Sequence, residues 1–358
     1  MDQDVERGHL IRILIAGNFR YPWYEKACAD ALERLGNEVI RFSWRGYFAS
    51  ALGRVEEYLA WSGSVTWRAN RALTRAVAEN ETDVLLVWRG VHVARDTLRL
   101  IRRQNPRCIL VSYNNDDPFG PSYSSGASIH QRRLWRRFLR AIPEYDLSFV
   151  YRSVNVPEYQ AAGARGVHVL MPYFVPELHH PQELTVEEKR LYECDAVFVG
   201  HYEADGRERY LRALARAGLK VRIFGTGWPN EVLVGISRGL RRAVPVYGAD
   251  YAKALSGAKM CLCFFSRLNR DSYTRRTFEI PACGRLMLSE RTEELTRLFA
   301  EDREAVLFGN EEDLVGKAMS CAKDDVRREG IAKAGLERVW SGGHDVVSRM
   351  ADMTRLFS

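Results

Sequence analysis

Apolar runs alternate with amphipathic stretches along the first half of the chain. The runs LIRILIAG (residues 10–17) and EVIRFS (residues 38–43) predict strands, and residues 24–35 between them have the spacing of a helix that ends at Gly36. Further strands are predicted at residues 83–90, 107–113, 146–152 and 167–173, and further helices at residues 65–79, 94–104 and 128–142. Because apolar strands alternate with helices, the pattern predicts a parallel sheet covered by helices on both faces.

A proline-punctuated segment then interrupts the pattern, with Pro172, Pro176 and Pro181 at short spacing. Proline fixes φ and lacks a backbone donor, so this segment predicts a linker. A second alternation follows, with strands predicted at residues 194–200, 220–227, 259–265, 285–290 and 304–309, and helices at residues 206–217, 250–256, 277–284, 293–299 and 311–358. We therefore expect an α/β protein with two Rossmann-like domains, residues 1–175 and 176–340, followed by a helix at residues 341–358.

Length and composition agree with a two-domain globular protein. The chain has 358 residues, and a single core rarely organises more than about 250–300. The seven cysteines are scattered without a CxxC pair, which is typical of small buried side chains in a reducing cytoplasm. No apolar run approaches the roughly 20 residues that span a bilayer, and the polar first nine residues do not have the pattern of a signal peptide. These features predict a soluble, cytoplasmic protein.

The charge is mildly basic. Lysine and arginine number 53, aspartate and glutamate 46, and the net charge is +7, with arginine dominating the excess. Guanidinium groups bind phosphate in a bidentate manner, so the excess fits an anionic ligand, a phosphate-bearing lipid surface or nucleic acid.

Glycine-containing loops after predicted strands are the first candidates for a site. Ligands in open parallel sheets bind beyond the carboxyl ends of the strands. This rule directs attention to the loops at Gly17, Gly200 and Gly225, and to the loop at residues 269–276.

The loop at residues 269–276 leads into a predicted helix that begins near Thr277 and Phe278. The free N–H groups of a helix start bind phosphate, Arg276 lies beside them, and Glu279 in the first turn could accept two hydrogen bonds from a ribose diol. The residues alone leave an alternative, in which the arginine is a solvated surface residue and the glutamate is placed by the helix dipole.

The stretch TRRTFEIPACGRLMLSE, with ADYAKALSGAKMCLCFFSRLNRD before it, resembles the CgeB-like (spore maturation type) glycosyltransferases of the group-1, GT-B superfamily. The resemblance is specific from about Asp195 to Phe308 and rests on the α/β pattern alone over the N-terminal half. In this superfamily a Glu-x7-Glu motif ends in a ribose-binding Glu before an Ala-Cys-Gly-like helix end, and Glu279 stands at that position. Asp271 stands eight residues earlier, where the superfamily has a Glu near the transferred sugar, and its side chain is one methylene shorter.

The resemblance implies a GT-B fold, in which the two parallel sheets face each other across a cleft and the C-terminal helix at residues 341–358 crosses back to the first domain. It also implies a glycine turn and basic residues that hold the diphosphate, for which Gly200, His201 and Arg207 are the candidates, with Gly225 in the next loop. Tyr247 matches the segment that meets the nucleobase, although a core position is the alternative. No metal is expected, because helix dipoles and arginines neutralise the leaving diphosphate in GT-B enzymes.

The first domain is expected to supply the acceptor site and a general base. Asp116 and Asp117 follow a predicted strand in the sequence YNNDDPF, and a carboxylate can deprotonate an acceptor hydroxyl. We expect Asp117 first and Asp116 second in this role. The alternative is a turn, because Asp-Asp-Pro is ordinary turn chemistry. His92 follows another strand and is a further, isolated candidate.

Five arginines and four large apolar residues alternate within residues 130–140. One interpretation is an amphipathic helix that packs on the sheet. The other is contact of Arg132–Arg140 with anionic lipid headgroups or a lipid-linked acceptor at the inner face of the membrane, and the same patch could meet nucleic-acid phosphates.

Together these observations predict transfer of a sugar from a nucleoside-diphosphate sugar, with a UDP-sugar favoured, to a hydroxyl of a saccharide or lipid-linked glycan, as in polysaccharide biosynthesis. No cofactor beyond this co-substrate is expected. One alternative is a non-catalytic sugar-nucleotide-binding protein. The other is a protein that binds nucleic acid or glycosylates its bases, although the sequence contains no recognised nucleic-acid-binding motif. Retention or inversion of the sugar configuration stays open.

Overall fold

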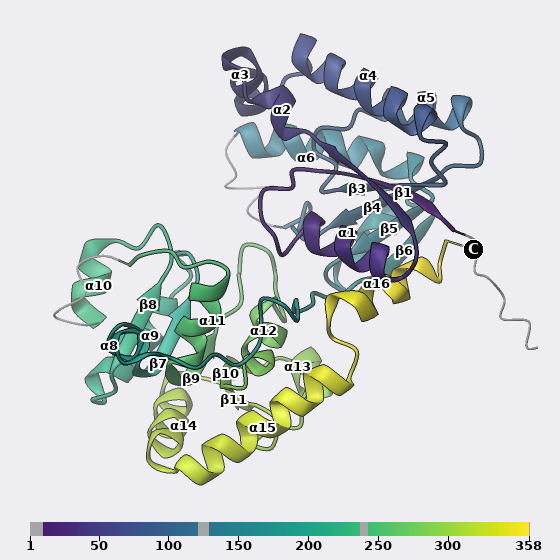
Figure 1. Ribbon diagram of the computed structural model, residues 1–358. Helices are drawn as coiled ribbons and strands as arrows, with labels where there is room; N and C mark the ends of the chain where they lie inside the picture. Colours follow the sequence, from purple (N-terminus) through teal and green to yellow (C-terminus); the bar gives the residue numbers. More distant parts are fainter. Residues whose placement is uncertain (1–9, 121–128, 237–242, 358) are drawn as a thin grey trace, which may run out of the picture. The chain divides into compact units, whose positions relative to one another are not determined.

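The chain divides into two compact units. The computed structural model describes residues 10–120, 129–236 and 243–357. One unit comprises the residues up to Met171 together with the segment from Val347 onward, and the other comprises Pro172–Val346. Each unit is built around a parallel sheet of its own (Figure 1).

Six strands form the sheet of the first unit, in the order β2-β1-β3-β4-β5-β6. All neighbouring pairs are parallel. The strands are β1 (Arg12–Gly17), β2 (Glu38–Ser43), β3 (Val84–Trp88), β4 (Ile109–Asn114), β5 (Leu147–Val150) and β6 (Gly166–Val169). Strand β3 is buried at every position, as expected for a strand covered on both faces.

Helices connect these strands and bury one face each. They are α1 (Glu25–Arg34), α2 (Arg45–Phe48), α3 (Ala51–Leu59), α4 (Ser64–Glu79), α5 (Arg95–Gln104), α6 (Ile129–Ala141) and α7 (Asn155–Ala161), with α16 (Val346–Thr354) at the end of the chain. Helix α4 shows why they pack as they do. Its Val65, Ala69, Leu73 and Val77 recur every fourth residue and are all buried in the core.

The second unit has five parallel strands in the order β11-β10-β9-β7-β8. The strands are β7 (Cys194–Val199), β8 (Val221–Phe224), β9 (Ala258–Cys263), β10 (Leu286–Glu290) and β11 (Val306–Phe308). Its helices are α8 (Val186–Tyr192), α9 (Arg207–Arg216), α10 (Asn230–Ile236), α11 (Ala249–Ser256), α12 (Arg276–Ala282), α13 (Glu293–Leu298), α14 (Glu311–Lys323) and α15 (Asp325–Ser341).

The predicted alternation of strands and helices is confirmed, with ends that differ by a few residues. The tail expected to be helical over residues 311–358 forms three helices, because Asp324 ends α14 and caps α15 through a bond from the Arg327 N–H. The short helices α2, α3, α7, α8 and α10 were not predicted.

The proline-punctuated segment packs into the second unit. Tyr173, Phe174 and Val175 are buried. Phe174 forms a parallel bridge with Asp345, in which the Phe174 N–H donates to the His344 carbonyl at 3.1 Å. The two stretches of chain that lead out of this unit are thus hydrogen-bonded to each other.

Candidate functional site

The strand order of the second unit places a switch point between β7 and β9, the position where ligands bind in open α/β sheets. Arg276 stands there. Its Nη1 donates to the Val199 carbonyl at 3.4 Å and its Nη2 to the Phe264 carbonyl at 3.3 Å. One guanidinium therefore bridges the carboxyl ends of the two strands that flank the switch point.

Two glycine turns meet beside Arg276. Gly225 follows β8 with φ of 150°, and a Cβ there would lie 1.9 Å from the Gly200 carbonyl oxygen, so the contact requires glycine. The Gly225 N–H donates to Val244 at 3.1 Å, which holds the segment leading to Tyr247 against the turn. Tyr247 is 52% exposed, so the core position considered for it is wrong.

The loop after Gly200 is organised by a buried network of charges. Arg207 is 2% exposed, and its guanidinium binds both carboxylate oxygens of Asp205 and donates to the His201 carbonyl. Glu203 accepts from Ser266 at 2.7 Å and pairs with His201 at 2.9 Å. Burial would raise the pKa of Glu203, but the bonds from His201 and Ser266 and the charge of Arg207 lower it to about 2. The loop after β7 is thereby fastened to the loop after β9.

Glu279 lies at the centre of a second buried cluster. Its Oε2 accepts from the Tyr251 hydroxyl at 2.6 Å, and its Oε1 lies 2.5 Å from Nη2 of Arg275 and 3.5 Å from Nε2 of His179. His179 Nδ1 accepts from the Val175 N–H at 2.9 Å, so the proton of the neutral ring is on Nε2 and faces the carboxylate. Glu279 therefore accepts a hydrogen bond from Tyr251 of α11 and lies beside Arg275, which precedes α12, and His179 of the proline-punctuated segment.

The protonation states of this cluster follow from burial and charge. Burial lowers the pKa of His179 to about 4, against the opposing pull of Glu279. Burial alone would raise the pKa of Glu279, but Arg275, His179 and the Tyr251 hydroxyl hold it below its ordinary value. Burial and the nearby carboxylate raise the pKa of Tyr251 well above its ordinary value. At neutral pH the cluster thus holds one carboxylate, one guanidinium, a neutral imidazole and a phenol.

The start of α12 differs from the expectation of free N–H groups. The Arg276 N–H donates to Thr274 Oγ1, and the N–H groups of Thr277 and Phe278 donate to the carbonyls of Thr274 and Arg275. Both Thr277 and Phe278 are fully buried. The short helix closes its own first turn, so its start does not present unsatisfied donors to a ligand.

Asp271 lies in the loop between β9 and α12, where its N–H donates to the Ser266 carbonyl at 2.9 Å. It is partly exposed. Its place near a transferred sugar, and the direct contacts of Gly200, His201 and Arg207 with a diphosphate, stay predictions.

In the first unit, the two aspartates after β4 have different environments. Asp117 is fully buried, and its Oδ1 accepts from the Phe119 N–H at 3.0 Å and from the Asn155 amide at 2.8 Å. This is the turn geometry considered as the alternative. Asp116 is partly exposed and pairs with Arg89 at 2.8 Å, so it is the aspartate that solvent can reach.

His92 and the basic helix are both packed against the first core. His92 is buried and stacks on Phe48, and burial lowers its pKa. On α6, Trp135 and Phe138 are buried, whereas Arg132, Arg136 and Arg140 are exposed. The amphipathic interpretation of this helix is confirmed for the side chains from Arg132 onward; those of residues 130 and 131 lie outside the described part.

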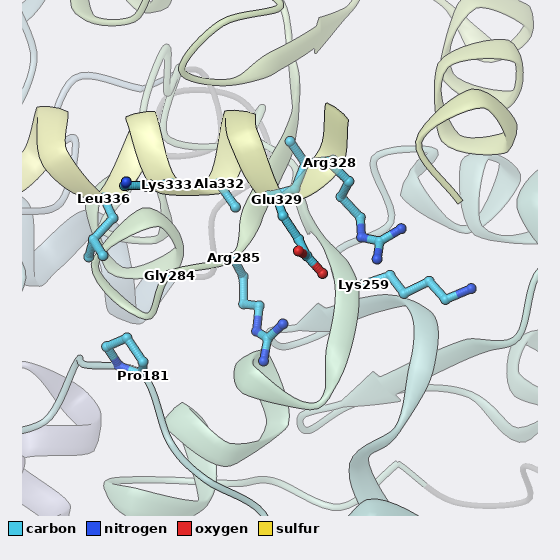
Figure 2. A pocket seen from close by; sticks show the side chains of 10 residues that line it. Pro181, Lys259, Gly284, Arg285, Arg328, Glu329, Ala332, Lys333 and Leu336 are labelled. Atoms are coloured by element: carbon cyan, nitrogen blue, oxygen red, sulfur yellow. The ribbon is translucent and has the colours of Figure 1, made fainter. Parts of the chain in front are cut away.

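A pocket of about 220 Å³ opens at the amino ends of the strands of the second sheet (Figure 2). Lys259 and Leu286 line it from the amino ends of β9 and β10, and Arg285 and residues of α15 complete it. Lys259 pairs with Asp195, and Arg328 of α15 pairs with Asp325. The pocket is therefore separate from the candidate site at the carboxyl ends.

Three general features complete the description. None of the seven cysteines forms a disulfide, and all seven are buried, as expected. Within the described ranges, no helix is long and apolar enough to cross a membrane. No group of three or more His, Cys, Asp or Glu side chains in these ranges could hold a metal ion.

Residues 207–355 match the family described as Glycosyl transferase-like. This region contains Gly225, Tyr251, Arg276 and Glu279. None of the curated proteins matches the chain.

Among solved structures, the chain resembles HepE of Anabaena in complex with UDP and glucose, with 15% identity, a TM-score of 0.63, and coverage of 97% of this chain and 99% of that one. It also resembles a sucrose-phosphate synthase of Thermosynechococcus elongatus (12% identity, TM-score 0.66, 97% and 98% coverage) and a glycosyltransferase of Rickettsia africae (12%, 0.65, 98% and 98%). With its two parallel-sheet units, the chain thus has the predicted GT-B fold.

Sequence reasoning missed Tyr251, His179, Glu203 and Ser266. His179 was assigned to a linker, and Tyr251 to an ordinary helix. Only the pairing of each residue with a distant partner identifies it, so no local signal could have found them.

Proposed function

We propose that this protein is a glycosyltransferase that moves a sugar from a nucleoside-diphosphate sugar to a hydroxyl group of a saccharide or lipid-linked glycan. A UDP-sugar is the favoured donor, because the crystal structure of HepE, a protein of the same fold, contains UDP and glucose. The CgeB-like subtype and independence from metal ions belong to this proposal.

The bridging position of Arg276 carries the proposal. The guanidinium lies at the switch point of the second sheet, beside the turn of Gly200 and within the region that matches the glycosyltransferase-like family. A diphosphate requires a cation at hydrogen-bond distance and a backbone that it can approach closely. The guanidinium and the glycine turns provide these two features side by side.

Glu279 is the proposed ribose ligand. A charged carboxylate accepts hydrogen bonds only, and a ribose diol offers O–H donors of the kind that Tyr251 already supplies. Arg275 and His179 position the carboxylate and keep it ionised. Arg207, whose guanidinium is buried against Asp205, is proposed to position the loop after Gly200.

In the first unit, Asp116 is the proposed base for an acceptor hydroxyl in an inverting reaction. Its partial exposure permits contact with a substrate, whereas Asp117 is engaged in its turn.

The test is a thermal-shift screen with UDP, GDP, ADP, CDP and dTDP, followed by mass spectrometry of reactions with the matching sugar conjugates. A ligand at 100 times its dissociation constant should stabilise the protein by about 2.7 kcal/mol. A shift with one base and transfer or hydrolysis of its sugar conjugate would support the proposal. Binding without any turnover would favour a sugar-nucleotide-binding protein instead, and no shift with any nucleotide would contradict the donor site itself.

A further inference from the structure

Helix α3 in the first unit exposes its apolar face to solvent, unlike an ordinary surface helix. Its apolar side chains Leu52, Val55, Tyr58 and Leu59 recur at helical spacing, and all are between 42% and 73% exposed. A surface helix of a globular protein normally turns such a stripe toward the core. Here Gly53 and the carboxylate of Glu56 are buried instead.

Glu56 fixes this orientation. Its Oε1 accepts from the Val65 N–H at 3.0 Å, and its Oε2 accepts from the N–H and hydroxyl of Thr66 at 2.8 and 2.9 Å. The carboxylate thus caps the start of α4, and burial of this bonded group prevents α3 from rolling its apolar stripe inward. The hydrogen bonds of Glu56 therefore hold the apolar stripe of α3 in its exposed position.

Two exposed tryptophans continue the stripe. Trp61 follows α3 and is 59% exposed, and Trp67 in the first turn of α4 is 60% exposed, with Arg71 over its ring. Contiguous exposed apolar residues of this kind mark interaction sites, and tryptophan and tyrosine favour the boundary between lipid and water.

Arginines border the same surface. Helix α6 lies against the end of α3, where Arg137 donates to the Ala60 carbonyl at 2.9 Å and Arg133 donates to the Leu59 carbonyl at 3.5 Å. Arg133 and Arg136 are exposed, and neither has an acidic partner among the described residues. Of the two glutamates on α3, Glu56 is buried in its cap, and Glu57 is partly exposed at 3.5 Å from Nε2 of His92, so one acidic side chain stands against the two arginines. The surface is therefore apolar and cationic at once.

We propose that α3, Trp61, Trp67 and the exposed arginines of α6 form a surface that docks the protein on an anionic lipid bilayer. The aliphatic stripe and the tryptophans enter the headgroup boundary, and the arginines bind lipid phosphates. A glycan would use the aromatic rings but gives no reason for Leu52, Val55 and Leu59. Two copies facing each other would bring the arginine borders together, which is unfavourable. The docking does not depend on the proposed transferase activity.

Co-sedimentation of the full chain with vesicles tests the proposal without donor or acceptor. Vesicles of phosphatidylglycerol and phosphatidylcholine in equal parts should bind the protein, and vesicles of phosphatidylcholine alone should bind it much less. Trp61→Ser with Trp67→Ser should weaken binding by roughly ten-fold or more. Arg133→Gln with Arg136→Gln should weaken it by about five-fold for each arginine.

Control variants change exposed apolar side chains and exposed arginines elsewhere. Val186→Ser with Val326→Ser removes two exposed apolar side chains, and Arg103→Gln with Arg216→Gln removes two exposed arginines. Both should bind vesicles as the natural protein does. Circular dichroism and the thermal midpoint show whether each variant folds.

Absence of binding to the anionic vesicles would overturn the proposal, as would equal losses in the patch and control variants. Analytical ultracentrifugation without lipid adds a separate outcome. Self-association that the two tryptophan substitutions abolish would assign this surface to a second copy of the chain and overturn the lipid proposal.

Discussion

His179 places its Nε2 atom 3.5 Å from Oε1 of Glu279, while its Nδ1 accepts from the Val175 N–H. A residue of the proline-punctuated segment therefore contacts the proposed ribose ligand in α12. The contact links the packing of that segment to the proposed donor site, and it makes the stability of the second unit depend on pH.

The first prediction concerns that dependence. The pKa of His179 is lowered from 6.5 in the unfolded chain to about 4 in the folded one, so the unfolded state binds the proton more tightly. The stabilisation is fully present above about pH 6.5 and is lost as the pH falls toward 4, by at most roughly 3 kcal/mol. His179→Asn retains an acceptor for the Val175 N–H but does not titrate. Urea unfolding between about pH 7 and about pH 4.5 should show a smaller loss in this variant, and equal losses would contradict a neutral, buried His179.

The second prediction concerns Glu279. Glu279→Gln keeps the shape of the side chain but removes its charge, so a ribose would lose a charge-assisted hydrogen bond of about 1.5–3 kcal/mol, roughly ten-fold to a hundred-fold in the dissociation constant of UDP. Isothermal titration calorimetry measures this. Tyr251→Phe is the control, because it removes a partner of Glu279 and leaves the charge. An unchanged affinity in Glu279→Gln would exclude the residue as a ribose ligand.

The third prediction concerns the two glycine turns. Gly225→Ala would bring a Cβ to 1.9 Å from the Gly200 carbonyl oxygen, so the turns must separate and UDP binding should be lost. Gly218→Ala is matched, because Gly218 also has a positive φ but has open space around its Cβ position. It should cost about 1 kcal/mol of backbone strain and leave UDP binding unchanged. Similar effects of both substitutions on UDP affinity would show that the contact between the turns is unimportant.

The fourth prediction separates the two aspartates of the first unit. Asp116→Asn should abolish transfer while leaving UDP affinity and the thermal midpoint nearly unchanged, because the side chain is partly exposed. Asp117→Asn should lower the stability by about 1–3 kcal/mol through its buried hydrogen bonds. Rates of transfer and thermal midpoints measure both. Full transfer by Asp116→Asn would remove it as the base, and loss of transfer without loss of stability in Asp117→Asn would restore Asp117.

Local patterns in the sequence predicted much of the fold. Buried strands such as Val84–Trp88 are continuous apolar runs, and helices such as α4 repeat apolar residues every fourth position, because each element must bury a face of fixed periodicity. The Glu279 region and the loops at Gly200 and Gly225 were identified for the same reason: they are short stretches of chain at the ends of predicted strands.

Other features depend on contacts between distant residues. Arg276 bridges two strand ends, whereas Arg207 forms a buried ion pair. Asp117 accepts hydrogen bonds within a turn, whereas the neighbouring Asp116 is accessible to solvent. Helix α3 carries an ordinary amphipathic pattern, yet its apolar side faces solvent because Glu56 caps a neighbouring helix. Periodicity depends on residues that are close in the sequence, so the amino-acid order specifies it. Burial, charge pairing and the direction that a helix face takes depend on residues that come together only in the tertiary structure.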